Sequence, residues 1–78
     1  MLVEIITPDA QLFVGEAISL VLPGTKGRFE ILNDHAPIIS TLVAGEIVIS
    51  LDKGQKKSFE IHGGVIEMRK NKIIVLAD

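Results

Sequence analysis

The stretch EIVISLDKGQKKSFEIH, residues 46–62, decides the fold class, because two runs of alternating residues flank a turn. From Ile47 to Leu51, apolar residues occupy every second position, and Phe59 and Ile61 repeat the pattern after the turn. A period of two is that of a half-buried β-strand. The segment 52–55, Asp-Lys-Gly-Gln, has the composition of a tight turn between strands. The stretch therefore predicts a β-hairpin.

Branched apolar residues and turn signals extend this pattern over the rest of the chain. Isoleucine and valine supply 19 of the 78 residues and favour pleated strands. Glycine or proline recurs about every ten residues, a spacing typical of a sandwich or barrel. The further strands that we expect are 2–7, 12–22, 28–32, 65–69 and 73–76, the last two joined by a hairpin turn at 70–72. No segment has the apolar periodicity of a helix, so residues 1–78 are predicted to form one all-β domain.

Glycines mark two irregular places in these strands. In the segment 12–22, the alternate positions from Ile18 to Leu22 are apolar, which predicts that they share one face. Gly15 interrupts the same segment and indicates a β-bulge. The pair Gly63-Gly64 lies between two strand runs, which indicates a bulge or the close approach of another backbone.

Composition excludes several classes of function. Eight basic against ten acidic residues leave a net charge of −2, whereas nucleic-acid-binding domains carry a basic face. The chain has no tryptophan or tyrosine for stacking on bases, and no cysteine for disulfides or thiolate metal sites. Its apolar runs are far shorter than the ~20 residues of a membrane helix. No leader peptide is recognisable, so we expect a cytosolic chain.

The apolar content points to a protein partner. Hydrophobic residues make up 47% of the chain, and the mean hydropathy is +0.44. A domain of this size buries only roughly 60% of the surface that its unfolded chain exposes. We therefore expect that part of the apolar surface stays outside the core and is covered by another protein.

Three groups of residues with chemical potential are better explained as structure. Gly24-Thr25-Lys26-Gly27 places a lysine between glycines, but a phosphate-binding loop needs four residues between its glycines and a following helix. Asp34, His35 and Ser40 lack the sharp turn that presents a serine nucleophile. The glutamates are scattered at strand spacing, without a cleft that would separate their pKa values. We expect no catalytic residue, no cofactor and no metal.

One alternative function stays open on the residues alone. Biotin and lipoate carriers are all-β domains of similar length that present a modified lysine at a hairpin tip. Lys70 lies at the tip of the predicted turn 70–72, but the preceding residues 66–69 lack the Met-Lys-Met or Asp-Lys core of those carriers. A plain hairpin with solvated lysines is the preferred prediction, and a carrier domain modified at Lys70 is the alternative.

Three longer segments together resemble the epsilon subunit of F-type ATP synthases, which is called delta in mitochondria. Residues 4–8 and 12–15 resemble the family's opening V-x-T-P-x-x-x-x-F-x-G. Residues 22–47, LPGTKGRFEILNDHAPIISTLVAGEI, resemble L-P-G-x-x-G-x-F-G-I-L-P-G-H-A-P-x-x-x-x-L-x-x-G. Residues 63–78 resemble G-G-x-x-E-V-x-x-N-x-V-x-V-L-A-D. The resemblance covers nearly the whole chain, and His35-Ala36-Pro37 with its flanks is its most specific part.

The resemblance implies a flattened β-sandwich of about ten short antiparallel strands, without the family's C-terminal helical hairpin. It also implies a non-catalytic subunit of the central stalk, or rotor, that joins the gamma subunit to the c-ring and supports the coupling of proton flow to ATP synthesis. Such a subunit is peripheral to the membrane, on the cytoplasmic face of the bacterial inner membrane, and needs no cofactor.

In this family, one face of the sandwich packs on gamma and one end rests on the polar loops of the c-ring. The residues implied to face gamma are His35, Ala36, Pro37 and Ser40. The residues implied to face the c-ring are Lys26, Gly27, Arg28 and Glu30.

The chain departs from the family in three places. Glu30 stands where the family usually has glycine, and Asn33-Asp34 replaces Pro-Gly. Arg28 occupies a position that is commonly acidic in relatives. Because residues i and i+2 of a strand share a face, we expect Glu30 to supply the missing negative charge. The sequence given ends at Asp78, where relatives usually continue into the hairpin that carries an inhibitory role and, in some, an ATP site; neither role is expected of residues 1–78.

Overall fold

A computed structural model describes all residues from 1 to 78 and contains seven strands. The strands are β1 (Leu2–Ile6), β2 (Gln11–Glu16), β3 (Ser19–Gly24), β4 (Gly27–Leu32), β5 (Ile38–Ser50), β6 (Lys56–Arg69) and β7 (Lys72–Ala77). A single 3₁₀ turn, η1 (Asp52–Gly54), joins β5 to β6. The prediction of an all-β domain is confirmed. The structure contains no helix with the length and apolar character that spanning a bilayer requires.

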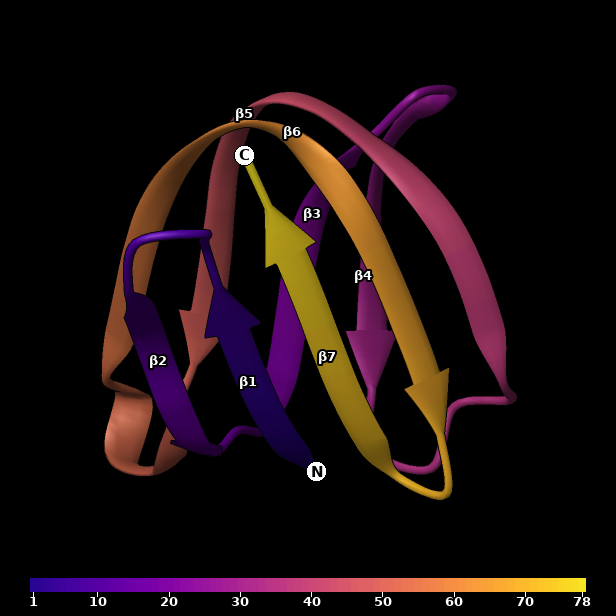
Figure 1. The fold of residues 1–78 in the computed structure, drawn as a ribbon. Helices are drawn as coiled ribbons and strands as arrows, with labels where there is room; N and C mark the ends of the chain where they lie inside the picture. The colour runs from indigo at the N-terminus through magenta and orange to yellow at the C-terminus, as the bar shows by residue number, and fades with distance from the viewer.

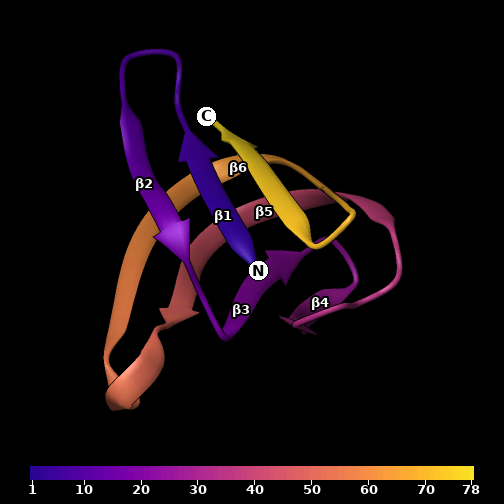
Figure 2. The same cartoon turned by 90° about the horizontal axis from the view of Figure 1, so that it is seen from below.

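One sheet folds over on itself to make both layers of the sandwich (Figure 1). Its strand order is β2-β1-β7-β6-β5-β3-β4. The strands β5 and β6 are 13 and 14 residues long and arch over one end of the molecule, so each belongs to both layers (Figures 1 and 2). The structure therefore has seven strands rather than about ten short ones, because these two continue through the arch instead of ending there.

The arch divides each long strand between two layers, which are defined here by their strands. The first layer consists of β2, β1, β7, residues 64–69 of β6 and residues 38–42 of β5. The second layer consists of β4, β3, residues 45–50 of β5 and residues 56–61 of β6.

Glycines permit the close packing at the arch. Gly63 and Gly64 have φ angles of 151° and 153°, a region that L-residues with side chains rarely adopt. A Cβ atom on Gly64 would lie 2.3 Å from the carbonyl oxygen of Leu76, on the neighbouring strand β7. The predicted close approach of another backbone at Gly63-Gly64 is thus confirmed.

Alternate residues of the strands fill the space between the two layers. In the first layer, Ile5, Val75 and Ile66 are paired side by side on β1, β7 and β6, and all three are fully buried. In the second layer, Ile31, Leu20 and Ile49 make the equivalent row on β4, β3 and β5. Together with ten further buried side chains they form one continuous core of 16 residues.

The pairing of β1 with β7 is parallel, in contrast to the all-antiparallel expectation. Val3 lies beside Ile73, and the register continues to Ile6 beside Leu76. The strand β7 forms an antiparallel hairpin with β6 and β1 forms one with β2. The strand β7 lies between β6 and β1 and so completes the first layer. The strands β1 and β7 run in the same direction (Figure 1).

The expected strand 12–22 is wrong as a single element. It consists of β2 and β3, which lie in different layers, and the chain crosses between the layers at Ala17 and Ile18. Ile18 is 48% exposed and does not share the buried face of Leu20. Gly15 pairs in regular register with Val3, and the register shifts instead between Ile5 and Ile6 of β1, where Leu12 is the extra residue in β2.

Both predicted hairpin turns are confirmed. In the turn between β5 and β6, Lys53 and Gly54 have φ angles of 59° and 74°, and the amide of Leu51 donates to the carbonyl of Gln55 at 2.7 Å. In the turn between β6 and β7, Lys70 and Asn71 have φ angles of 52° and 59°. Two consecutive residues with positive φ give the turn type that matches the twist of a β-hairpin.

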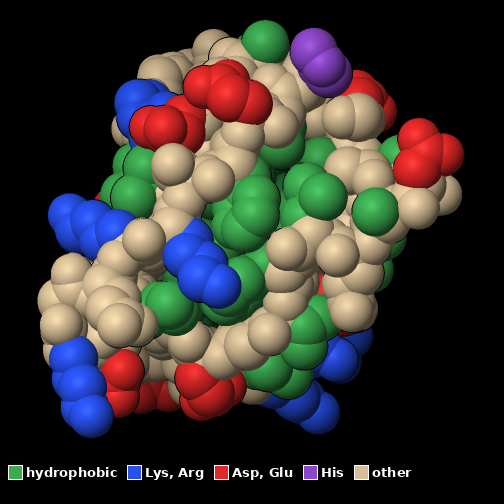
Figure 3. Space-filling model, turned by 90° about the vertical axis from the view of Figure 1, so that its left-hand side faces the viewer, with side chains coloured by type: hydrophobic (Ala, Val, Ile, Leu, Met, Phe, Trp, Pro, Cys, Tyr) green, Lys and Arg blue, Asp and Glu red, His purple; other side chains and the backbone are tan.

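The sandwich is open on one side, between β2 and the first half of β6. Both are free edges there, since β2 ends the sheet and residues 56–62 of β6 pair only with β5. Phe13 and Phe59 meet in this opening with ring centroids 6.2 Å apart, and the Nζ atom of Lys57 lies 5.8 Å from the centroid of Phe13. Figure 3 shows this side, with hydrophobic side chains visible between the layers and a basic side chain lying across them.

Candidate interaction surfaces

The outward surface of the first layer, together with Val43 where β5 enters the arch, carries most of the exposed hydrophobic side chains, and we call it the apolar face. Six of the eight large hydrophobic side chains that the structure exposes lie on it. They are Leu2, Val14, Ile39, Val43, Val65 and Leu76. Each is adjacent on its strand to a buried or half-buried residue, so its side chain points away from the core. Ile39 is the most exposed of them, at 73%.

The centre of the apolar face is continuous across three strands. Val65 on β6 is directly opposite Leu76 on β7, and both line one shallow depression with Ile39 and Ile74. Glu67 is the only charged residue that lines this depression. A contiguous apolar patch of this kind is rare on the exposed surface of a monomer, and it is typical of a surface that another protein covers.

The outward surface of the second layer has the opposite character, and we call it the charged face. Glu46 on β5 and Glu60 on β6 are directly opposite each other, and Glu30 lies on the edge strand β4. Like charges in opposite positions destabilise a strand pair unless they are well hydrated or paired. The charged face is therefore suited to water or to a cationic partner rather than to apolar burial.

The four residues expected to face the c-ring cluster around the hairpin between β3 and β4. Its tip, residues 24–27, is a two-residue turn in which Gly24 pairs with Gly27, and Lys26 is exposed there. Arg28 and Glu30 follow on β4 and are exposed on the charged face, while Phe29 and Ile31 point inward. The prediction that positions 28 and 30 share a face is confirmed.

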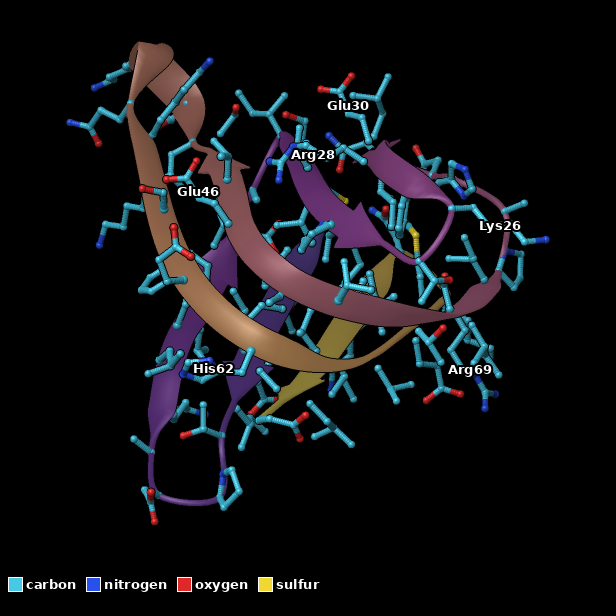
Figure 4. The ribbon with its side chains drawn as sticks, turned by 90° about the horizontal axis from the view of Figure 1, so that it is seen from above. Lys26, Arg28, Glu30, Glu46, His62 and Arg69 are labelled. Carbon is cyan, nitrogen blue, oxygen red and sulfur yellow. The ribbon has the colours of Figure 1, made fainter.

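The Arg28 side chain makes a specific contact within the chain. Its Nη1 atom donates a hydrogen bond of 2.8 Å to the backbone carbonyl of Glu46, on β5. In Figure 4, Arg28 lies between Glu30 and Glu46, whereas Lys26 lies apart from this group. Arg28 is thus engaged with the chain's own backbone.

The residues expected to face gamma do not all lie together. His35, Ala36 and Pro37 are exposed in the loop from β4 to β5, and Pro37 borders a depression shared with Ile39 at the edge of the apolar face. Ser40 is two residues from Leu42, which is buried, and pairs with Ile66, which is fully buried. Its side chain therefore points to the inner side of the sheet.

Ser40 lies beside the other predicted set instead. It lines a depression with Gly24, Lys26 and Phe29, next to the tip of the β3–β4 hairpin. The structure thus brings Ser40 together with the residues expected at the c-ring, and leaves His35, Ala36 and Pro37 near the apolar face.

Because Ser40 points to the inner side of the sheet, a charge at position 40 should lower the stability of the domain. We expect Ser40→Glu to lower the free energy of unfolding by about 1–3 kcal/mol, because the half-buried carboxylate loses hydration on the inner side of the sheet. The matched control Thr41→Glu is on the opposite, exposed side of the same strand and should change stability by less than about 0.5 kcal/mol. Urea denaturation of the two variants measures the difference, and equal stabilities would contradict this orientation of Ser40.

The three residues of the rejected catalytic triad, Asp34, His35 and Ser40, make hydrogen bonds with other partners and not with one another. The Nδ1 atom of His35 lies 2.7 Å from the carbonyl oxygen of Ala36, and the Ser40 hydroxyl donates to the carbonyl of Thr41. The amide of Asp34 donates to the side-chain oxygen of Asn71 at 2.8 Å, which ties this loop to the β6–β7 turn. The structure therefore does not bring Asp34, His35 and Ser40 together as a triad.

The sequence predicted an apolar surface covered by a partner, but not which residues form it. Its best signal was Ile73-Ile74-Val75-Leu76, a run without any alternation. Such a strand is apolar on both faces, which in a small two-layer domain means that one of the two faces must meet something outside the domain.

Comparison with known proteins connects this chain to one family. The family described as "ATP synthase, Delta/Epsilon chain, beta-sandwich domain" matches residues 1–78. The chain is 39% identical to the ATP synthase epsilon chain of Chlorobium limicola over 75 residues, which cover 96% of this chain and 85% of that protein. It is 43% identical to the ATP synthase epsilon chain of Leptospira borgpetersenii over 77 residues, which cover 97% of this chain but only 59% of that protein.

Solved structures share the fold at lower identity. A chain in the mitochondrial ATP synthase of Euglena gracilis superposes with a TM-score of 0.89 at 16% identity, over 96% of this chain and 48% of that one. A chain in the central stalk and c-ring of the Tetrahymena thermophila enzyme gives a TM-score of 0.83 at 16% identity, over 97% of this chain and 61% of that one. These comparisons give no support to the alternative of a carrier domain modified at Lys70.

Proposed function

Because this chain belongs to the delta/epsilon family of ATP synthase, as the β-sandwich domain of that family, we propose that it is a non-catalytic part of the rotating central stalk. In this role it joins the gamma subunit to the c-ring and supports the coupling of proton flow to ATP synthesis. It is then held at the cytoplasmic face of a bacterial inner membrane through its partners, without inserting into the bilayer.

The apolar face is the observation that carries this proposal. An exposed patch centred on Ile39, Val65 and Leu76 is costly in water and is stabilised when a partner covers it. We assign the gamma subunit to this face, with the loop His35-Ala36-Pro37 at its edge. Ser40 points to the inner side of the sheet and is not part of the contact.

The tip of the β3–β4 hairpin is assigned to the c-ring. It projects from the end of the sandwich where β5 and β6 arch over, and it exposes Lys26 with the polar backbone of a turn (Figure 1). Polar groups of this kind suit the polar loops of a membrane ring. The continuous strand β5 then runs from the gamma contact at Ile39 to the region next to the tip, so the two contacts are joined by one rigid element.

A close-packed sandwich suits a mechanical role. Its core consists of 16 apolar side chains. No buried side-chain nitrogen or oxygen atom in the domain lacks a hydrogen-bond partner. Close-packed interiors deform little under load, which lets the domain carry torque between the gamma subunit and the ring.

Reconstitution tests the proposed function. Membrane vesicles are prepared with the ATP synthase of a family member stripped of its epsilon chain, and residues 1–78 are added back. We expect gamma to be retained by the tagged chain in a pull-down and ATP-driven proton pumping to recover. The chain heated beyond its unfolding transition is the control. Binding to neither gamma nor the stripped enzyme would contradict the proposal.

A further inference from the structure

The strands β3 and β5 do not pair continuously near the arch. They pair from Ser19 to Val21, and the ladder resumes only at Gly24, which lies opposite Leu42. Over this interval the four residues of β3 from Val21 to Gly24 lie opposite the seven residues of β5 from Leu42 to Val48. Pro23 lies in the interval and has no N–H group to donate. The hairpin tip beyond it is thus not connected to the rest of the sheet by an unbroken ladder.

Arg28 bridges this interruption from the far side of β3. Arg28 is on β4, opposite Pro23 of β3. Its guanidinium crosses β3 and reaches the carbonyl of Glu46 on β5, at 2.8 Å. The crossing is possible because the backbones are close here: a Cβ atom on Gly45 would lie 2.8 Å from the Cβ atom of Pro23. The Arg28 side chain therefore connects β4 to β5 across β3, at the place where the hydrogen-bonded pairing of β3 with β5 is interrupted.

Two further polar contacts between the tip and β5, both made by Thr25 and Thr41, are long. The Thr25 amide reaches the Thr41 carbonyl at 3.4 Å, and the hydroxyls of the same two residues are also 3.4 Å apart. These separations are longer than those of well-formed hydrogen bonds. A hydrogen bond from a charged donor at 2.8 Å is stronger than either, so Arg28 supplies the strongest side-chain link between the hairpin and β5, in addition to the resumed ladder pair of Gly24 with Leu42.

We propose that Arg28 is a positioning residue, which fixes the tip of the β3–β4 hairpin against β5 through the Glu46 carbonyl and so sets the orientation of Lys26. The inference rests on the proposed function, in which this tip contacts the c-ring. Arg28 acts through the tip and not through its own charge on the partner. It replaces the expectation that Glu30 compensates for a repelling charge at position 28.

Order at the tip tests the bridge in the chain alone. Arg28→Met keeps a long stem without a donor, and Arg28→Lys keeps a cationic donor. In ¹⁵N-labelled chain we expect Arg28→Met to speed exchange of the Thr25 amide about five-fold, and to lower tip order parameters from ~0.85 toward ~0.6. Arg28→Lys should stay within about two-fold of the parent, as should the control Glu30→Gln. An equally ordered tip in Arg28→Met would overturn the proposal.

Proton pumping by the reconstituted complex separates positioning from direct charge contact. If Arg28 positions the tip, Arg28→Met and Arg28→Glu lose pumping to the same several-fold extent, and Arg28→Lys retains it. A direct contact with a basic partner loop would instead make Arg28→Glu pump better than the parent, which would overturn the proposal, as would full pumping by Arg28→Met. Failure of the parent chain itself to restore pumping would contradict the proposed function, and the order of the tip would still decide whether the bridge exists.

Discussion

Gly64→Ala is expected to lower the free energy of unfolding by more than about 3 kcal/mol, a large part of the ~5–15 kcal/mol that stabilises a typical domain. The added Cβ would lie 2.3 Å from the Leu76 carbonyl oxygen and 3.0 Å from the Cα of Ala77. Both are backbone atoms of β7, so neither can move aside as a flexible side chain does. The φ angle of 153° adds strain for any residue with a side chain.

The measurement is urea denaturation followed by circular dichroism, with Gly54→Ala as the matched control. Gly54 also has a positive φ, of 74°, but a Cβ there would have no neighbour within 4 Å. The control isolates the conformational cost of alanine at positive φ, about 1 kcal/mol. If both variants lost the same stability, the close approach of β7 to β6 would not be the cause.

Ile39→Glu is expected to weaken the binding of gamma at least about 30-fold while leaving the sandwich folded. Ile39 is 73% exposed in the free chain, so a glutamate there is hydrated and costs little stability. In the proposed complex the same carboxylate would be buried in the apolar face without a partner. Leaving one charge unpaired in an interface typically costs 2–5 kcal/mol or more, which corresponds to this loss of affinity.

Leu32→Glu is the matched control for this face. Leu32 is also a large exposed side chain, at 53%, but it lies at the end of β4 in the second layer and outside the apolar face. Affinity for gamma is measured by titration calorimetry, and folding of both variants by urea denaturation. Full affinity of Ile39→Glu, or an equal loss in Leu32→Glu, would show that gamma binds another surface.

Local pattern sufficed to predict the two hairpins, since both turns are encoded by neighbouring residues such as Lys53-Gly54 and Lys70-Asn71. The first half of β5 was missed for a physical reason. Along residues 38–43, the inward positions face the core and the outward positions Ile39 and Val43 belong to the apolar face. Because both sides of the strand are apolar in part, the alternation that marks a half-buried strand is absent.

The interaction surfaces were less predictable than the fold. Whether Ser40 points inward or outward depends on its register with Ile66, which one sequence cannot specify. Likewise, nothing near Arg28 in the chain predicts its bond to the Glu46 carbonyl, because Glu46 is 18 residues away and the ladder interruption arises only when β5 bends.

The parallel partnership of β1 with β7 also governs the order in which the chain can fold during synthesis. Val3 acquires its neighbour Ile73 only after the intervening chain has left the ribosome, so the contacts that complete the first layer are among the most distant in sequence. Non-local pairing slows folding, since the long loop must close before the contact is made. Until then β1 and β2 form an isolated hairpin, which is marginal in water. Nascent chains of this domain should therefore stay sensitive to proteases until residues 72–77 emerge, and then become resistant in one step.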